Sequence, residues 1–178
     1  MCGRFNLRTN PAAFVAAFDA APPAGSGQLL LRYNIAPTQT ILAVRQTGSV
    51  REAVPLRWGL IPSWSKDAKI GARLINARAD TAPDKPSFRS AFKRRRCLVP
   101  ASGFYEWQGQ AGAKQPYHIF PSRGGLMAFA GLWERWQPPG GDGDAVESCT
   151  ILTTEANETL RDLHDRMPVI LAPTDYRA

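Results

Sequence analysis

The chain begins Met1-Cys2-Gly3-Arg4. Cysteine is small enough for the initiator methionine to be removed before it, so we expect Cys2 to become the amino terminus. An amino-terminal cysteine carries an amine and a thiol on adjacent carbons, a pair that no internal cysteine offers. An aldehyde can form an imine with the amine, after which the thiol adds to the same carbon and closes a thiazolidine ring.

The ordinary pKa values of these two groups suit such chemistry. Values of about 7.7–8.0 for an α-amine and about 8.5 for a thiol leave part of each deprotonated near neutral pH. A cysteine at position two, taken alone, is more often an inert residue of a first strand. The interpretation of Cys2 therefore depends on what the rest of the chain places around it.

Four further segments combine polar and aromatic residues in a manner typical of a reactive site. They are residues 32–38, residues 57–64 leading to Asn-Ala-Arg at 76–78, residues 97–107 and residues 164–171. Together with Cys2-Gly3-Arg4, and in this order, they resemble the SOS-response-associated peptidase (SRAP) family, abasic-site-processing proteins that crosslink themselves to DNA. The resemblance runs from Cys2 to the end of the chain, without the loops near 20–28 and 136–146.

Carried over by matching residues, the resemblance implies an active site of Cys2, Asn76, Glu106 and His164. Asn76 can donate and accept hydrogen bonds at once. Glu106 stands between two aromatic residues of a predicted strand and suits proton transfer. His164 suits acid–base assistance in opening the deoxyribose ring near neutral pH. The structural alternatives are a turn-stabilising amide, an exposed strand carboxylate and a cap at the end of a helix.

The resemblance also implies a positively charged DNA groove. Arg4 and Arg78 match its phosphate contacts. The residues that would line the groove or stack on a base are Asn34, Pro37, Trp64 and Trp107.

Other positions leave alternatives open. A core position is as good an interpretation for Trp58 and Trp64 as a place in the groove. Arg166 either contacts phosphate or pairs with Asp165 or Asp162.

These implications predict a DNA repair protein that binds an abasic site in single-stranded DNA. It would form a thiazolidine crosslink through Cys2 after Met1 is removed, and so shield the strand from scission. Lyase-like chemistry and peptidase-type release of its own Met1 belong to the same implication, and no cofactor is required. Two alternatives remain: an amidohydrolase with Cys2 as amino-terminal nucleophile, and a single-stranded nucleic-acid-binding module without chemistry.

Three departures from the family pattern stand out. Met1 is present in the sequence, and a retained methionine would block the amine of Cys2. Asp80 stands where the family usually has glutamate. The part that normally follows the last strand is missing, so we expect residues 1–178 to be one domain, truncated at its carboxyl end and loosened near His164.

Composition agrees with a nucleic-acid partner. The 178 residues are 44% hydrophobic and 21% charged, an ordinary globular balance, and the net charge of +7 favours polyanions. The run Lys93-Arg94-Arg95-Arg96 is expected to end a helix on a solvated face.

Composition also excludes some classes. No apolar run is long enough for a bilayer, and no signal peptide is visible. We expect a monomer that is cytoplasmic and nucleoid-associated in a bacterium, or nuclear in a eukaryote. Three isolated cysteines argue against a disulfide framework, and two histidines far from any Cys-x-x-Cys pair argue against a metal site.

Local patterns predict three helices. Asn10 caps a helix through residue 18 with Pro11 at its first position, Ser87 caps another through residue 95, and Thr154 caps a third through about residue 163. Loops are expected at 21–28, 59–75 and 137–145, and a hairpin turn at 109–115.

About eight short strands complete the prediction. They cover residues 41–45, 54–58, 97–99, 103–108, 117–120, 126–135, 148–153 and 169–171. Few βαβ units are visible, so we predict an α+β fold, a single compact domain with a mostly antiparallel, barrel-like β core and a few short helices.

Overall fold

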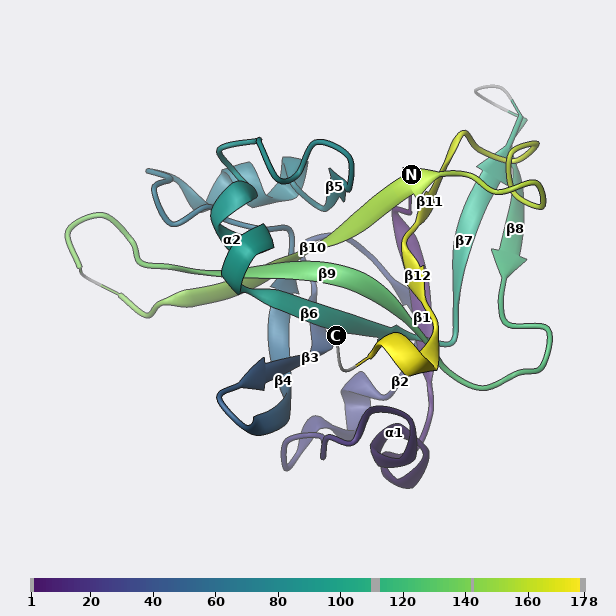
Figure 1. Ribbon diagram of the computed structural model, residues 1–178, viewed down its shortest axis with the longest axis horizontal. Helices are drawn as coiled ribbons and strands as arrows, with labels where there is room; N and C mark the ends of the chain where they lie inside the picture. The colour runs from purple at the N-terminus through teal and green to yellow at the C-terminus, as the bar shows by residue number, and fades with distance from the viewer. Residues whose placement is uncertain (1, 110–112, 142, 177–178) are drawn as a thin grey trace.

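The first strand of the chain lies in a four-stranded antiparallel sheet (Figure 1). The computed structural model describes residues 2–109, 113–141 and 143–176. The order of this sheet is β2-β1-β7-β8, with bounds β1 Arg4–Arg8, β2 Leu31–Ile35, β7 Gly103–Gln108 and β8 Gln115–Ile119. In register, Arg4 lies opposite Tyr105, and Tyr105 lies opposite His118.

A second, larger sheet closes on itself. Its ring runs β10-β4-β3-β6-β9 and is completed by pairing of β10 with β9. The bounds are β3 Thr40–Thr47, β4 Val50–Trp58, β6 Arg96–Ala101, β9 Met127–Trp136 and β10 Val146–Glu155. Three short strands join its edges: β5 Asn76–Arg78, β11 Arg166–Pro168 and β12 Ile170–Leu171.

The ring-like arrangement confirms the predicted α+β class with a mostly antiparallel β core. Parallel pairing occurs where β10 meets β4 and β5, and the other recorded pairs are antiparallel. The hydrophobic core lies between the two sheets. Alternation along β1 buries Phe5 and Leu7, and the Phe5 ring packs edge-on against Trp58 and Phe129 at 5.2 and 6.0 Å.

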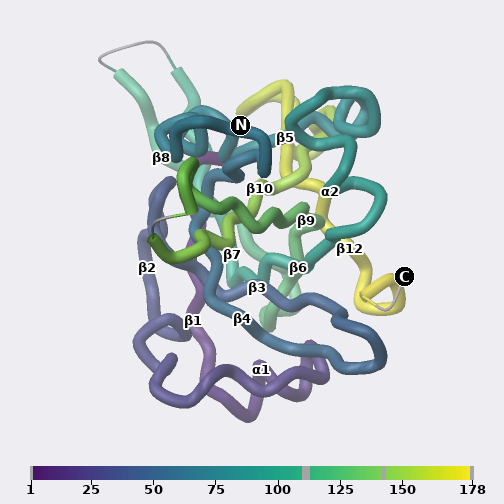
Figure 2. Tube along the Cα trace, turned by 90° about the vertical axis from the view of Figure 1, so that its left-hand side faces the viewer, coloured from purple at the N-terminus to yellow at the C-terminus, as the bar shows by residue number. Residues whose placement is uncertain are grey.

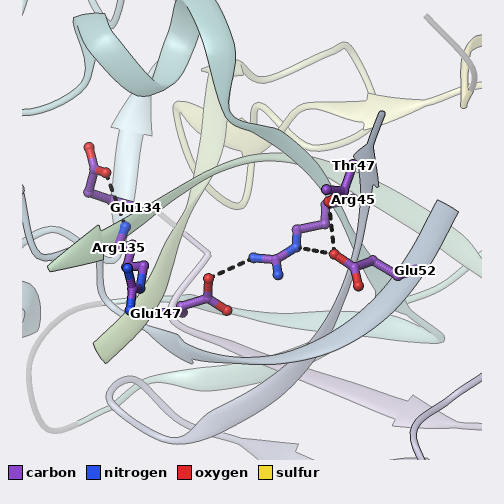
Figure 3. Close-up of polar contacts among 6 residues, drawn as sticks. All are labelled: Arg45, Thr47, Glu52, Glu134, Arg135 and Glu147. Carbon is purple, nitrogen blue, oxygen red and sulfur yellow. Dashed lines mark hydrogen bonds and ion pairs between the residues drawn. The ribbon is translucent and has the colours of Figure 1, made fainter. Parts of the chain in front are cut away.

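A largely buried arginine links four strands of the ring (Figure 3). The guanidinium of Arg45 donates to Glu52 at 2.8 Å and to Glu147 at 3.0 Å, and it lies 4.3 Å from the ring centre of Trp133. The Arg45 guanidinium lowers the pKa of the Glu52 carboxyl. This cluster ties β3, β4, β9 and β10 together at one end of the ring.

The first predicted helix is confirmed. Helix α1 spans Pro11–Phe18, and the Asn10 side chain accepts a hydrogen bond from the Ala13 amide at 2.9 Å. Figures 1 and 2 show α1 at the end of the molecule opposite to the start of β1. Helix α2 spans Arg89–Arg94 with Lys93 and Arg94 in its last turn, as the basic run predicted.

Two helix predictions are wrong. Phe88, with no side-chain cap, precedes α2 in place of the predicted Ser87 cap. No helix follows Thr154, because Thr154 and Glu155 extend β10 and pair with Met167 and Arg166. Residues 158–163 form turns instead.

The remaining differences concern strands and loops. Strands β1 and β2 were not among the predicted elements. Two short 3₁₀ helices, η1 Ser26–Leu29 and η2 Ala68–Arg73, lie in or overlap predicted loops, and a third, η3 Pro173–Asp175, follows β12. The hairpin turn at 109–115 joins β7 to β8, although its residues 110–112, like residue 142 of the loop 137–145, lie outside the described residues.

Candidate functional site

Cys2 is fully buried directly before β1. The side-chain amide of Asn76 donates a 2.9 Å hydrogen bond to the Cys2 carbonyl oxygen. Asn76 opens β5, which is held by parallel pairing with β10, and both views place the start of β1 close to β5 and β10 (Figures 1 and 2). The predicted expulsion of Met1 falls on a residue outside those described.

Glu106 approaches Cys2 from β7. Its side chain is almost fully buried, at 5% exposure, and it lies on the same face of the strand as the core residue Phe104. Burial raises the pKa of the Cys2 thiol, and the negative charge of Glu106 raises it further. In the folded chain with Met1 attached, both effects disfavour the thiolate relative to the ordinary thiol considered from the sequence.

Asn76 keeps one polar atom unused. Its Oδ1 is buried and has no hydrogen-bond partner among the described residues. The neighbouring Ile75 carbonyl accepts a 2.9 Å hydrogen bond from the Trp58 indole, and Trp58 is fully buried. The core alternative for Trp58 is thus the correct one, and this contact anchors the chain directly before Asn76.

The prediction that His164 ends a helix is wrong, because it follows the turns at 158–163. Its segment is tied to the Glu106 strand, because Gln108 Nε2 donates to the Asp162 carbonyl at 2.9 Å. His164 Nδ1 lies 2.9 Å from the Arg166 amide and 2.6 Å from the Asp165 carboxylate. The neutral ring accepts from the amide, whereas a protonated ring donates to the carboxylate, so the two contacts serve different protonation states.

The predicted phosphate contacts lie on both sides of Cys2. On β1, the Arg4 guanidinium donates to Asn34 Oδ1 at 2.9 Å, so these two candidates are brought together. On β5, the Arg78 guanidinium is exposed and pairs with Asp80 at 2.8 Å. This pair raises the pKa of Arg78, to which nearby Asp165 also contributes, and lowers the pKa of the Asp80 carboxyl.

Arg166 has neither of the acidic partners suggested for it among its recorded hydrogen bonds. Its guanidinium donates to the Thr153 carbonyl at 2.6 Å and to Thr153 Oγ1 at 3.3 Å. These contacts span the β10–β11 ladder next to His164. Arg166 therefore also stabilises the strand pair that leads out of the His164 segment.

The aromatic candidates differ in exposure. Trp64 is 58% exposed, which excludes the core alternative, and its indole lies 3.4 Å from the Pro86 carbonyl. Trp107 is 36% exposed on the face of β7 opposite to Glu106. Pro37 is half-buried in the turn that leads from β2 to β3.

Two positioning residues had no signal in the sequence. Gln108 and Thr153 are ordinary polar strand residues, and their roles depend on partners 54 and 13 residues away. Their contacts could be identified only from the strand pairing in the structure.

Neither recorded cavity includes the four predicted catalytic residues. One, of about 710 Å³, is lined by residues including Arg45, Cys97 and Tyr176, and the other, of about 670 Å³, by residues including Arg8 and Phe120. Within the described ranges, no group of three or more His, Cys, Asp or Glu side chains could hold a metal ion. In the same ranges, no helix has the length and apolar character needed to cross a membrane.

Comparison with known proteins identifies the family. The chain is 45% identical over 172 residues to the abasic site processing protein YoqW of Bacillus subtilis, covering 96% of this chain and 76% of that protein. It is 39% identical over 144 residues to the abasic site processing protein HMCES of Xenopus tropicalis, covering 69% of this chain and 43% of that protein.

Solved structures show the same fold. A crystal structure of a protein from Bacteroides thetaiotaomicron superposes with a TM-score of 0.88 at 27% identity, covering 99% of this chain and 79% of that one. One from Bordetella bronchiseptica gives 0.83 at 28% identity, covering 98% and 86%. The family model of the SOS response associated peptidase (SRAP) matches residues 1–178, and the chain belongs to this family.

Proposed function

We propose that this protein processes abasic sites in single-stranded DNA by forming a covalent thiazolidine with Cys2. The relatives named above as abasic site processing proteins support the substrate class. The observation that carries the proposal is the placement of Cys2, whose carbonyl is held by Asn76 while its thiol lies in the field of Glu106. Met1 must be released first, because the proposed nucleophile is the α-amine of Cys2.

The chemistry proceeds in two steps. The Cys2 amine attacks C1′ of the ring-opened sugar, and loss of water gives an imine. The thiol then adds to the imine carbon, its proton passes through Glu106 to the nitrogen, and the five-membered ring closes. The net reaction joins aldehyde and aminothiol with loss of one water, and it needs neither an oxidant nor a metal.

The neutral thiol favours this order of events. Because burial and Glu106 disfavour the thiolate, the amine is the better first nucleophile, and the buried carboxylate is placed to accept the thiol proton in the second step. An amidohydrolase would need the thiolate for its first attack, so the same observation counts against that alternative.

The helping residues have distinct tasks in this proposal. Asn76 holds the Cys2 carbonyl with its amide and offers its unused Oδ1 to the substrate or to the amine. His164 assists ring opening as acid or base. Arg4, Arg78 and Arg166 bind the phosphates on either side of the lesion. All these groups come from one chain, so a monomer suffices.

An intact-mass experiment tests the proposal. The purified protein is incubated with a single-stranded oligonucleotide that carries one abasic site. We expect loss of Met1, then a heat-stable adduct equal to protein plus oligonucleotide minus one water. Cys2→Ala should give no stable adduct, Cys2→Ser only a labile imine, and Cys97→Ser, which alters a buried strand cysteine, the wild-type yield.

Three results would refute it. A full yield of stable adduct with Cys2→Ala would exclude Cys2 as the covalent residue. Multiple turnovers on an amide substrate, without DNA capture, would support the amidohydrolase. Identical DNA binding by Cys2→Ala and wild type, with no adduct in either, would support the binding module.

A further inference from the structure

Three aromatic rings stack in a row on the outer face of the four-stranded sheet. The rings of Tyr105 and His118 are 4.9 Å apart with 29° between their planes, and those of His118 and Phe120 are 5.1 Å apart with 30°. We call these three residues the ring stack. Phe120 is 60% exposed, so the last ring of the stack is open to solvent.

Gly103 makes room for the ring stack. A Cβ atom at this position would lie 2.5 Å from His118 Nε2 and 2.7 Å from the Ile119 carbonyl oxygen. The absence of a side chain at Gly103 therefore lets the imidazole lie flat over β7 between its two neighbours.

A hydrogen-bond network fixes the inner end of the ring stack. The fully buried Asn6 donates from Nδ2 to His118 Nε2 at 2.7 Å and to the Tyr105 hydroxyl at 3.2 Å. The Tyr105 hydroxyl in turn donates to the Tyr33 carbonyl at 2.8 Å. These bonds order the rings before any ligand arrives, which lowers the entropic cost of stacking a ligand on them.

The surroundings of the ring stack are basic. Arg8 lies with its guanidinium carbon 5.8 Å from the ring centre of Tyr33, which is 64% exposed. The four strands carry three arginines, whereas their one acidic residue, Glu106, is buried on the other face. Beyond Phe120, the surface continues into the groove of about 670 Å³ that Arg8 and Asn10 also line.

The face of the ring stack also carries two of the predicted DNA contacts. Arg4 lies directly opposite Tyr105, and the half-exposed Trp107 is on the same side of β7. From Trp107 to Gly103, which is next to Phe120, the strand advances four residues, about 14 Å at ~3.4 Å per residue. A strand of nucleic acid that contacts Arg4 and Trp107 can therefore reach the ring stack with bases a few positions away.

We propose that the ring stack, with Tyr33 and Arg8, is a stacking platform for unpaired bases that flank the reacting nucleotide. Flat rings accept any base, and arginines beside them suit the phosphates between the bases. This inference rests on the proposed function, since the abasic site fixes where the strand enters. It adds a second point of contact, distant from the reacting sugar, that favours single strands over duplex, where the bases are paired and stacked.

The test varies the length of DNA around the lesion. Oligonucleotides with one abasic site are prepared with single-stranded arms of two or ten nucleotides on the 5′ side, the 3′ side or both. Binding is measured by fluorescence anisotropy with Cys2→Ala in the background of every variant, so that no covalent step contributes. The variants are Phe120→Ala, Tyr33→Ala and Gly103→Ala, and Val50→Ala removes an equally exposed apolar side chain elsewhere as control.

The long arm on one side should strengthen binding by the reference protein. Phe120→Ala should weaken binding of that oligonucleotide by about 5- to 150-fold, the range for loss of one stacked base, and leave the short one unchanged. Gly103→Ala should have a similar effect with Phe120 still present, because it displaces His118. Val50→Ala should bind all oligonucleotides like the reference.

Equal affinities of the reference, Phe120→Ala and Tyr33→Ala for the long-armed oligonucleotides would overturn the inference. If those variants bind DNA normally but lose a protein partner, the platform faces a protein and the inference is also wrong. Failure of the proposed function would give a different experimental result from failure of the stacking platform. The protein with Cys2 intact would then give no adduct, while binding to undamaged strands of two lengths would still report on the platform.

Discussion

The side-chain amide of Asn76 and the carbonyl oxygen of Cys2 are 2.9 Å apart, a contact between residues separated by 74 positions in the chain. Asn76 is in turn anchored from behind, because Trp58 donates to the carbonyl of Ile75 and β10 pairs with β5. One side-chain amide thus fixes the position of the first residues of the chain relative to the larger, ring-like sheet.

Replacing Asn76 tests the importance of this contact. Asn76→Ala should slow adduct formation by about 10²-fold, because a misplacement of about 1 Å at a reacting group has that effect. Single-turnover rates with an abasic oligonucleotide measure it. Asn10→Ala is the control, since it should lower the free energy of unfolding by about 1 kcal/mol through loss of the α1 cap and leave the rate unchanged. Equal rates for Asn76→Ala and wild type would show that the contact positions nothing.

Replacing Glu106 or His164 should lower the rate of crosslinking but not its final yield. Removing a positioned acid or base typically costs ~10²–10⁴ in rate, so Glu106→Gln and His164→Ala should crosslink slowly yet reach the full yield. The two contacts of His164 Nδ1, with the Arg166 amide and the Asp165 carboxylate, are lost in His164→Ala, so its segment should position the substrate less well. Glu158→Gln, an exposed change in the neighbouring turns, is the matched control. A wild-type rate for His164→Ala would leave His164 without a catalytic role.

The Arg78–Asp80 pair predicts opposite effects for its two members. Arg78→Ala should reduce the salt dependence of single-strand binding by about 0.7 in the log–log slope, equivalent to one phosphate contact. Asp80→Asn should strengthen binding, because it releases the guanidinium from its ion pair. Arg94→Ala in α2 makes the same charge change as Arg78→Ala and should leave the slope nearly unaltered. Weaker binding by Asp80→Asn would contradict the assignment.

His118 predicts a pH dependence of stability. Burial, and secondly the charge of Arg8, lower the pKa of His118 below its ordinary value near 6.5. Between the two values the unfolded chain binds more protons than the folded one, so stability is complete above pH ~6.5 and decreases as the pH falls through this window. Urea unfolding at several pH values measures the effect. His118→Phe should remove this part of the pH dependence, and an unchanged curve would show that the ring does not titrate differently on folding.

Local signals in the sequence predicted local structure well. The Asn10-Pro11 start of α1 is confirmed because the cap and its partner Ala13 are three residues apart. The helix expected after Thr154 fails because Thr154 and Glu155 pair with residues beyond a ten-residue connection, and propensity is a weak prior against such pairing. Strand β1 did carry a signal, since Phe5 and Leu7 alternate with polar residues, although over only five positions.

For the candidate site too, the residue types could be predicted from the sequence but their arrangement in space could not. The residue types at Cys2, Asn76 and Glu106 were readable from the motifs, and their proximity required strand pairings that no local pattern encodes. The protonation state of the Cys2 thiol was outside the reach of the sequence, since it depends on complete burial next to Glu106. The row of rings on β7 and β8 was equally hidden, because it requires both the register of that hairpin and the gap left by Gly103.

Strand β10 has a consequence for the order of assembly. It pairs with β4, β5, β9 and β11, and so it holds both Asn76 and the exit of the His164 segment. During synthesis, Cys2 is among the first residues to leave the ribosome, whereas the strand that carries Asn76 finds its partner only when residues 146–155 have emerged. Pairings over such sequence distances form slowly. Strand β7, which carries Glu106 and pairs with β1, emerges earlier, so the contact between Asn76 and Cys2 is the later of the two to form. In the proposed mechanism, Cys2 thus gains its positioning amide only after β10 is in place.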